Sequence, residues 1–214
     1  MKSSNYAVYI VESPHSDDFL AGRAEGRTLS QILDLGGILN QYRLAINRDA
    51  LHKAIELSVH DVKLRRSETQ KRWIPILHIS CHGDASGLEL SNGDRVEWSE
   101  LGELLKLFYD QKIAADFAVL YLSMSACEGI HAFRADVENG KSPFVSIVGP
   151  LTEVGWAEAL VAYSVYYYNL ILAESNAWNA AIRMNQSIGK EKLFQVYLGR
   201  QLRDALGIRL PEDP

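Results

Sequence analysis

The chain has 214 residues and a mass of 24.0 kDa, a length that allows one domain with a substantial core. Its 22 basic and 27 acidic residues give a net charge of −5, which argues against nucleic-acid binding, because phosphate recognition needs clustered Lys and Arg. The two cysteines, Cys81 and Cys127, are too few for a disulfide scaffold or a four-thiolate zinc site. They leave three interpretations: one disulfide, two inert core thiols, or a reactive thiol.

The apolar stretches indicate the cellular compartment of the protein and whether it crosses a membrane. Residues 6–11 form an apolar run that is too short for a secretory signal, so we expect a cytoplasmic protein, in which stable disulfides are rare. The longest apolar stretch, residues 154–173, contains Glu158, whose burial in lipid would cost about 2.5 kcal/mol or more. This stretch therefore predicts a buried helix and no membrane association.

Short apolar runs with the composition of β-strands recur along the chain. Strands are predicted at residues 6–11, 38–46, 74–79, 117–124 and 144–148. Asn92-Gly93, between two further short runs, is the signal of a β-hairpin within residues 88–97.

Apolar residues at helical spacing occupy the segments between these strands. The first predicted helix contains Leu29 and Leu33 and ends at Gly36; the second is capped by Asp49, and a third begins at Ser99. Helical patterns account for the rest of the chain. Because strand and helix alternate, we expect a single α/β domain over residues 1–214, with three layers, a mostly parallel central sheet and helices on both faces.

Two predicted strands end in residues suited to nucleophilic chemistry. His82 and Gly83 follow the strand at 74–79, and Cys127 follows the strand at 117–124. A single crossover between these strands would place them side by side, and sites in parallel sheets form at the carboxyl ends of strands. We therefore predict Cys127 as a nucleophile and His82 as its general base, with the backbone N–H groups of Gly83 and Cys127 as oxyanion donors.

The segments around these residues resemble those of caspase-like cysteine proteases. Residues 77–83, Leu-His-Ile-Ser-Cys-His-Gly, are similar to their strand–His–Gly element, and residues 122–129, Leu-Ser-Met-Ser-Ala-Cys-Glu-Gly, to their strand–Ala–Cys element. The resemblance is closest to the CHAT subgroup and covers residues 5 to about 189. It implies a caspase-like α/β/α sandwich and a Cys-His dyad that cleaves peptide bonds without a metal or cofactor.

The resemblance also implies a biological setting. It suggests an effector that is switched on by a partner or a small ligand, as in bacterial defence, and that acts on a protein or peptide. The Thr expected between Glu128 and Gly129 is missing, so the nucleophile loop is one residue shorter than in the subgroup. That departure keeps a second function open, namely a non-catalytic caspase-like module that binds a ligand or a partner.

Candidate substrate-binding residues come from the same resemblance. In the wider clan, the pocket for the residue before the scissile bond is lined by the loop after the first strand and by loops beyond the nucleophile strand. Here the first loop holds Asp17 and Asp18, whose carboxylates could pair with a basic side chain. Trp156 could line the same pocket. The alternatives are a solvated, helix-capping turn for the two carboxylates and a core position for the tryptophan.

Two further residues near His82 have structural interpretations. Side chains alternate along a strand, so Cys81 is predicted to face away from a cleft that His82 faces, as a packed core thiol. His78 lies on the same strand face as His82. Together with Cys127 and His131 it could form a zinc site, which is a third interpretation of the Cys and His residues at these strand ends. Packing in the core is the favoured prediction for His78.

Overall fold

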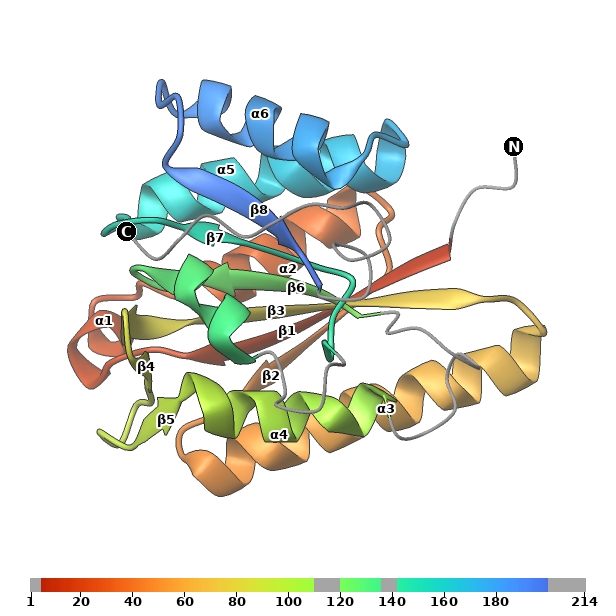
Figure 1. Cartoon of the computed structure of the whole chain (residues 1–214), viewed down its shortest axis with the longest axis horizontal. Coiled ribbons are helices and arrows are strands. Elements are labelled where there is room, and N and C mark those ends of the chain that lie inside the picture. The colour runs from red at the N-terminus through yellow and green to blue at the C-terminus, as the bar shows by residue number, and fades with distance from the viewer. Residues whose placement is uncertain (1–4, 110–119, 136–141, 200–214) are drawn as a thin grey trace.

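The computed structural model describes residues 5–109, 120–135 and 142–199, and its centre is a mostly parallel sheet (Figure 1). The main path of the sheet runs in the order β2-β1-β3-β6-β7-β8. Pairings from β2 to β7 are parallel, and β8 joins β7 antiparallel. The strands are β1 (Asn5–Ser13), β2 (Asn40–Leu44), β3 (Trp73–Asp84), β6 (Tyr121–Ser125), β7 (Ser146–Pro150) and β8 (Phe194–Leu198).

Helices cover both faces of this sheet (Figure 1). One face carries α3 (Arg48–Thr69) and α4 (Trp98–Tyr109), and the other carries α2 (Glu25–Leu35), α5 (Trp156–Tyr167) and α6 (Ala177–Ser187). Alternate residues of β3 face opposite sides of the sheet. Leu77 and Ile79 pack toward α3 and α4, whereas Ile76 packs toward α2 and α5. The predicted three-layer α/β/α arrangement is thus confirmed.

Shorter elements connect these layers. They are α1 (Ser16–Leu20), the 3₁₀ helix η1 (Gly129–Ala135) and a π-helical turn, η2 (Tyr168–Leu172), that continues α5. The predicted hairpin is confirmed as β4 (Gly87–Glu89) and β5 (Arg95–Glu97). Gly93 adopts a φ of +85° in its turn, which glycine adopts without steric cost. The hairpin matters for the site because β4 pairs with residues 82–84 of β3.

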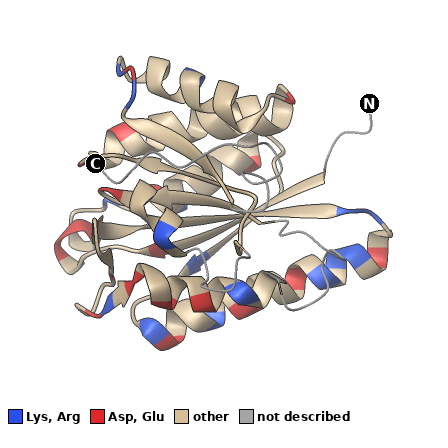
Figure 2. Cartoon of the chain, viewed as in Figure 1, with Lys and Arg blue, Asp and Glu red and all other residues tan. Residues whose placement is uncertain are grey.

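The longest apolar segment forms a helix against the sheet, as predicted. Tyr163, Tyr166 and Tyr167 of α5 are fully buried in the core beside α2 and α6. Within the described ranges, none of the helices combines the length and apolar character needed to cross a bilayer. Charged residues of both signs are spread along α3 (Figure 2).

The structure corrects two predictions about individual elements. Asn47, not Asp49, caps α3: it has the extended backbone of a cap, and its side chain accepts a hydrogen bond from the Ala50 N–H at 2.8 Å. Residues 194–198 form a strand, where helical patterns were predicted. Buried and half-buried residues alternate along β8, the period of two that identifies a strand, but over too few residues to stand out in the sequence. Residues 117–119 of the predicted strand at 117–124 lie outside the described ranges.

Candidate active site

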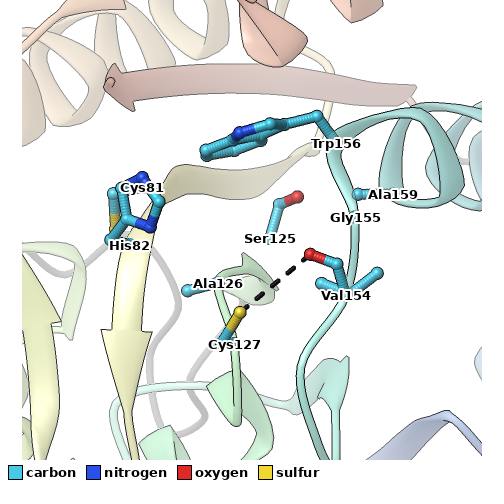
Figure 3. Close-up of a pocket in the computed structure, with 9 residues that line it drawn as sticks. All are labelled: Cys81, His82, Ser125, Ala126, Cys127, Val154, Gly155, Trp156 and Ala159. Carbon is cyan, nitrogen blue, oxygen red and sulfur yellow. Dashed lines mark hydrogen bonds between the residues drawn. The ribbon is translucent and has the colours of Figure 1, made fainter. Parts of the chain in front are cut away.

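His82 and Cys127 leave the same edge of the sheet from neighbouring strands. Ser80 of β3 pairs with Ser125 of β6, which is the last pair of that parallel ladder. His82 lies two residues beyond Ser80, and Cys127 lies two residues beyond Ser125. Both residues line one pocket (Figure 3). The crossover inferred from the sequence therefore brings the two candidate residues together.

The pocket has a volume of about 130 Å³. A cavity of roughly 150 Å³ can hold a benzene molecule, so this pocket can accept a single side chain. Its walls come from the ends of β3 and β6 and from the start of α5. They are formed by Cys81, His82, Ser125, Ala126, Cys127, Val154, Gly155, Trp156 and Ala159.

A tight turn directs Cys127 into this pocket. Glu128 follows with a φ of +54°, a left-handed conformation that costs a non-glycine residue about 1 kcal/mol or more. The Cys127 thiol donates to the carbonyl oxygen of Val154, with an Sγ to O distance of 4.0 Å. Figure 3 shows the sulfur at the edge of the space that Trp156 closes from above.

The two free thiols differ in their surroundings. Cys81 is 1% exposed and belongs to the core cluster beneath α3 and α4, although it also borders the pocket. Burial raises the pKa of the Cys81 thiol well above its ordinary value, and the neighbouring Cys127 and Glu25 add to the rise. Cys127 is only partly buried. The accessible sulfur is therefore that of Cys127.

The nucleophile turn has no room for a side chain at position 129. A Cβ on Gly129 would lie 2.9 Å from both the Cβ and the carbonyl oxygen of Met124. We expect Gly129→Ala to lower the free energy of unfolding by about 1–3 kcal/mol, because the turn must shift away from β6. Urea denaturation measures this change. Gly155→Ala is the matched control, since a Cβ there meets nothing nearer than the Glu158 carboxylate at 3.7 Å. Equal losses in the two variants would contradict the prediction.

A carboxylate fixes the imidazole of His82. The Nε2 of His82 lies 2.8 Å from Oδ2 of Asp18, and the Trp156 ring meets the imidazole edge-on at 5.3 Å between centroids. Burial alone would raise the pKa of Asp18, but hydrogen bonds from His82 and Trp156 and the charge of Arg23 hold that pKa below its ordinary value. The carboxylate of Asp18 thus engages the Nε2 side of the imidazole, and Nδ1 is the ring nitrogen that Asp18 does not engage.

Gly83 lies between the hairpin and the nucleophile strand. A Cβ at this position would lie 3.0 Å from the Gly87 carbonyl oxygen, 3.2 Å from the Ala126 Cβ and 3.5 Å from the Cys127 carbonyl oxygen. Only glycine fits there without displacing one of these groups. The backbone of Gly83 thus runs beside that of Cys127, and the role of their N–H groups as oxyanion donors stays a prediction.

The predicted substrate-binding residues lie on two sides of His82. Trp156 is the first residue of α5 and lines the pocket. Asp17 and Asp18, in α1, line an open groove of about 410 Å³ together with His82, Gly83 and residues of the hairpin. The Asp17 side chain is 88% exposed, whereas Asp18 also pairs with Arg23, whose Nη1 lies 3.2 Å from Oδ1. The cap of α1 is His15, whose Nδ1 accepts from the Asp17 N–H.

Sequence reasoning missed the contact between Asp18 and His82 and the presence of Ser125 in the pocket wall. The first contact joins residues 64 positions apart through a loop, and no periodicity signals it. Ser125 could have been noticed as a polar residue in an otherwise apolar strand.

The zinc alternative finds no support in the described ranges. No group of three or more His, Cys, Asp or Glu side chains there is placed to hold a metal ion. His78 is instead fully buried, with Nδ1 hydrogen-bonded to the Tyr167 hydroxyl at 2.9 Å.

Comparison with known proteins identifies the fold. No protein-family model and no curated protein matches the chain in sequence. The crystal structure of the Arg-specific cysteine proteinase gingipain R matches with a TM-score of 0.52 and 11% identity, over 92% of this chain and 46% of the gingipain chain. A complex of the Porphyromonas gingivalis RgpB pro- and mature domains matches with a TM-score of 0.51 and 12% identity, over 92% and 48%. The chain spans about half the length of these proteins, and it shares their caspase-like α/β fold.

Proposed function

We propose that the chain is a cysteine endopeptidase that cleaves peptide bonds after a basic residue. The observation that carries the proposal is that an accessible thiol and a carboxylate-anchored imidazole line one pocket the size of a side chain. The neighbours in fold are cysteine proteinases, which supports peptides as substrates, and one of these neighbours, gingipain R, is Arg-specific.

The proposed reaction uses groups at the sheet edge. Nδ1 of His82 takes the proton of the Cys127 thiol, and the thiolate attacks the carbonyl carbon of the scissile bond. The N–H groups of Gly83 and Cys127 stabilise the oxyanion, and His82 returns the proton to the leaving amine, which leaves a thioester. A water molecule, deprotonated by His82, then attacks the thioester, and the acid product and the free thiol are released.

The residues around the dyad have distinct proposed roles. Trp156 forms a wall of the pocket for the side chain before the scissile bond. Asp18 positions His82, because its carboxylate is already engaged by the imidazole and by Arg23. Asp17, in the groove beside Gly83, is the more accessible of the two acids predicted to contact a basic substrate side chain.

The sequence resemblance supports a finer proposal about regulation. We infer a CHAT-type effector that a partner or small ligand switches on, active in the cytoplasm in bacterial defence. The Ala-Cys-Glu-Gly and Cys-His-Gly segments are its basis.

One observation favours the second function, a non-catalytic binding module. The Cys127 thiol donates to Val154, and the His82 imidazole is held by Asp18, so the described contacts do not join the dyad. Catalytic hydrogen bonds are often absent without substrate and form when it binds, so this arrangement is also that of a resting protease.

A thiol-directed peptide electrophile separates the two functions. A peptidyl chloromethyl ketone with arginine next to the reactive group should alkylate Cys127, since the thiolate displaces chloride while His82 holds the proton. We expect peptide mapping by mass spectrometry to find the label on Cys127 and not on Cys81. Native protein left unlabelled at Cys127, or labelled at the same rate as after unfolding, would argue for the binding module.

A further inference from the structure

The two helices that cover the sheet beside α2 expose large apolar side chains. α5 and its continuation η2 run one way, residues 173–176 turn the chain, and α6 returns against them as a helical hairpin (Figure 1). We call these elements, residues 156–187, the α5–α6 hairpin. Five of its side chains are 46–59% exposed, namely Val161, Tyr168, Leu172, Trp178 and Ile182.

α5 is apolar on its outer side as well as on its inner side. Only Glu158 and Ser164 of its twelve residues are neither aliphatic nor aromatic. A helix at the surface of a protein normally carries polar residues on the side that faces away from the core, whereas a helix that is apolar all round is normally covered. The outer side of α5 therefore indicates a surface that another molecule covers.

The hairpin carries little charge, and the charges that it carries balance. Residues 168–187 contain one acidic and one basic residue, Glu174 and Arg183, whereas charged residues of both signs are spread along α3 on the opposite face of the sheet (Figure 2). A two-fold interface brings the same surface of two copies together, so a patch with several charges of one sign would repel itself. A patch with one charge of each sign is instead suited to pairing with itself.

The area of this helical layer is close to what a stable dimer needs. α5 and η2 together span residues 156–172, which corresponds to about 25 Å along the helix axis. α2 packs against the same helix and adds the exposed side chains of Ile32 and Leu35, so the layer is three helices, or about 27 Å, wide. Its outer face is thus roughly 700 Å², compared with about 800 Å² per partner in interfaces of standard size.

We propose that the α5–α6 hairpin binds the same hairpin of a second copy of this chain, with the two α6 helices antiparallel. When this pairing is centred between Trp178 and Ile182, Trp178 of each copy packs on Ile182 of the other. Glu174 then lies about one helical turn from Arg183 of the other copy, and the two-fold axis repeats this contact. The proposal does not depend on the proposed function, because it uses neither the dyad nor the pocket.

The mass in solution tests the pairing. Sedimentation velocity of the full chain, and of Cys127→Ala, is measured at concentrations of about 1–100 µM, at which dimers of moderate affinity form and dissociate. At the upper concentrations we expect twice the chain mass of 24.0 kDa. A monomer at every concentration would mean that no second copy covers this face, and would overturn the proposal.

Two substitutions on α6 locate the interface. Trp178→Ala should raise the Kd of the dimer by about 30-fold or more, because tryptophan side chains supply much of the binding energy of such interfaces. Ile182→Asp places a charge against an apolar surface and should also favour the monomer. Leu57→Asp, at a 41% exposed position of α3, is the matched control and should leave the Kd unchanged. A dimer that both α6 variants leave intact, with circular dichroism showing that they fold, would place the interface elsewhere and overturn the assignment.

Two charge reversals test whether the face pairs with itself. Glu174→Arg sets two positive charges against each other in the dimer, and Arg183→Glu sets two negative charges, so each variant alone should have a Kd about tenfold above that of the wild type. A mixture of the two variants restores both pairs of opposite charges and should associate with the wild-type Kd. No such rescue is expected if the natural occupant of the face is a different protein. A mixture that associates no better than either variant alone would overturn the antiparallel pairing.

Discussion

Cys127→Ala is expected to abolish peptide cleavage, with a loss in kcat of about 10⁴-fold or more, because the variant cannot form the thioester. The fold should remain, since Cys127 is only partly buried and its thiol makes one long contact with Val154. Initial rates on an arginine peptide measure the first effect, and circular dichroism with thermal unfolding measures the second.

The second cysteine supplies the matched control for this variant. Cys81→Ala removes the same thiol from the core, so it should lose about 1 kcal/mol of stability and keep most of the cleavage. A Cys127→Ala variant that still cleaves at the wild-type rate would eliminate the proposed mechanism. So would a Cys81→Ala variant that folds normally but is inactive, because the nucleophile would then have been assigned to the wrong cysteine.

His82→Ala is expected to lower kcat by about 10³-fold, with a smaller effect on KM, because general acid–base catalysis is lost while the pocket is kept. The side chain of His82 is 43% exposed, so the fold should tolerate the change. His60→Ala, at an exposed position on α3, is the matched control and should leave the rate unchanged. Wild-type turnover in His82→Ala would show that another group carries the proton.

A substitution of Asp18 is expected to lower the rate less than the loss of His82 does. Asp18→Asn keeps the shape of the side chain but presents an amide to the imidazole, so the favoured tautomer and ring orientation are lost. A misplacement of this kind costs about 10²-fold in rate, less than the loss of the imidazole itself.

The lowered pKa of Asp18 also makes the stability of the fold depend on pH. The folded-state pKa of Asp18 lies below its ordinary value, so its contribution to stability is fully present at pH values above the ordinary pKa. That contribution is lost as the pH falls through the lowered, folded-state pKa.

The layers of the fold were predictable because strong apolar runs dominate them. The buried segments of β1 and β3 are short apolar runs, which are typical of buried strands, and the Asn-Gly turn identifies the hairpin. β8 was missed because its five residues show alternation too briefly to outweigh a helical context. The cap of α3 was misassigned because Asn47 and Asp49 are both suitable residues, and only the backbone conformation chooses between them.

The candidate site was partly accessible to the same reasoning. A single crossover between two strands implies that His82 and Cys127 are neighbours, because the carboxyl ends of adjacent parallel strands lie side by side. The contact of Asp18 with His82 depends on how α1 packs, which only the tertiary structure determines.

The pairing of β3 with β6 sets the relative position of His82 and Cys127. Since Ser80 and Ser125 are in register, the spacing of His82 and Cys127 depends on the ladder and not on the length of chain that joins the two strands. Residues inserted into that crossover would leave the dyad in place. A single residue inserted into β6 would instead turn the thiol to the opposite face of the sheet, beneath α4. The position of the dyad is therefore more sensitive to a change in the length of β6 than to a change in the length of the segment that precedes it.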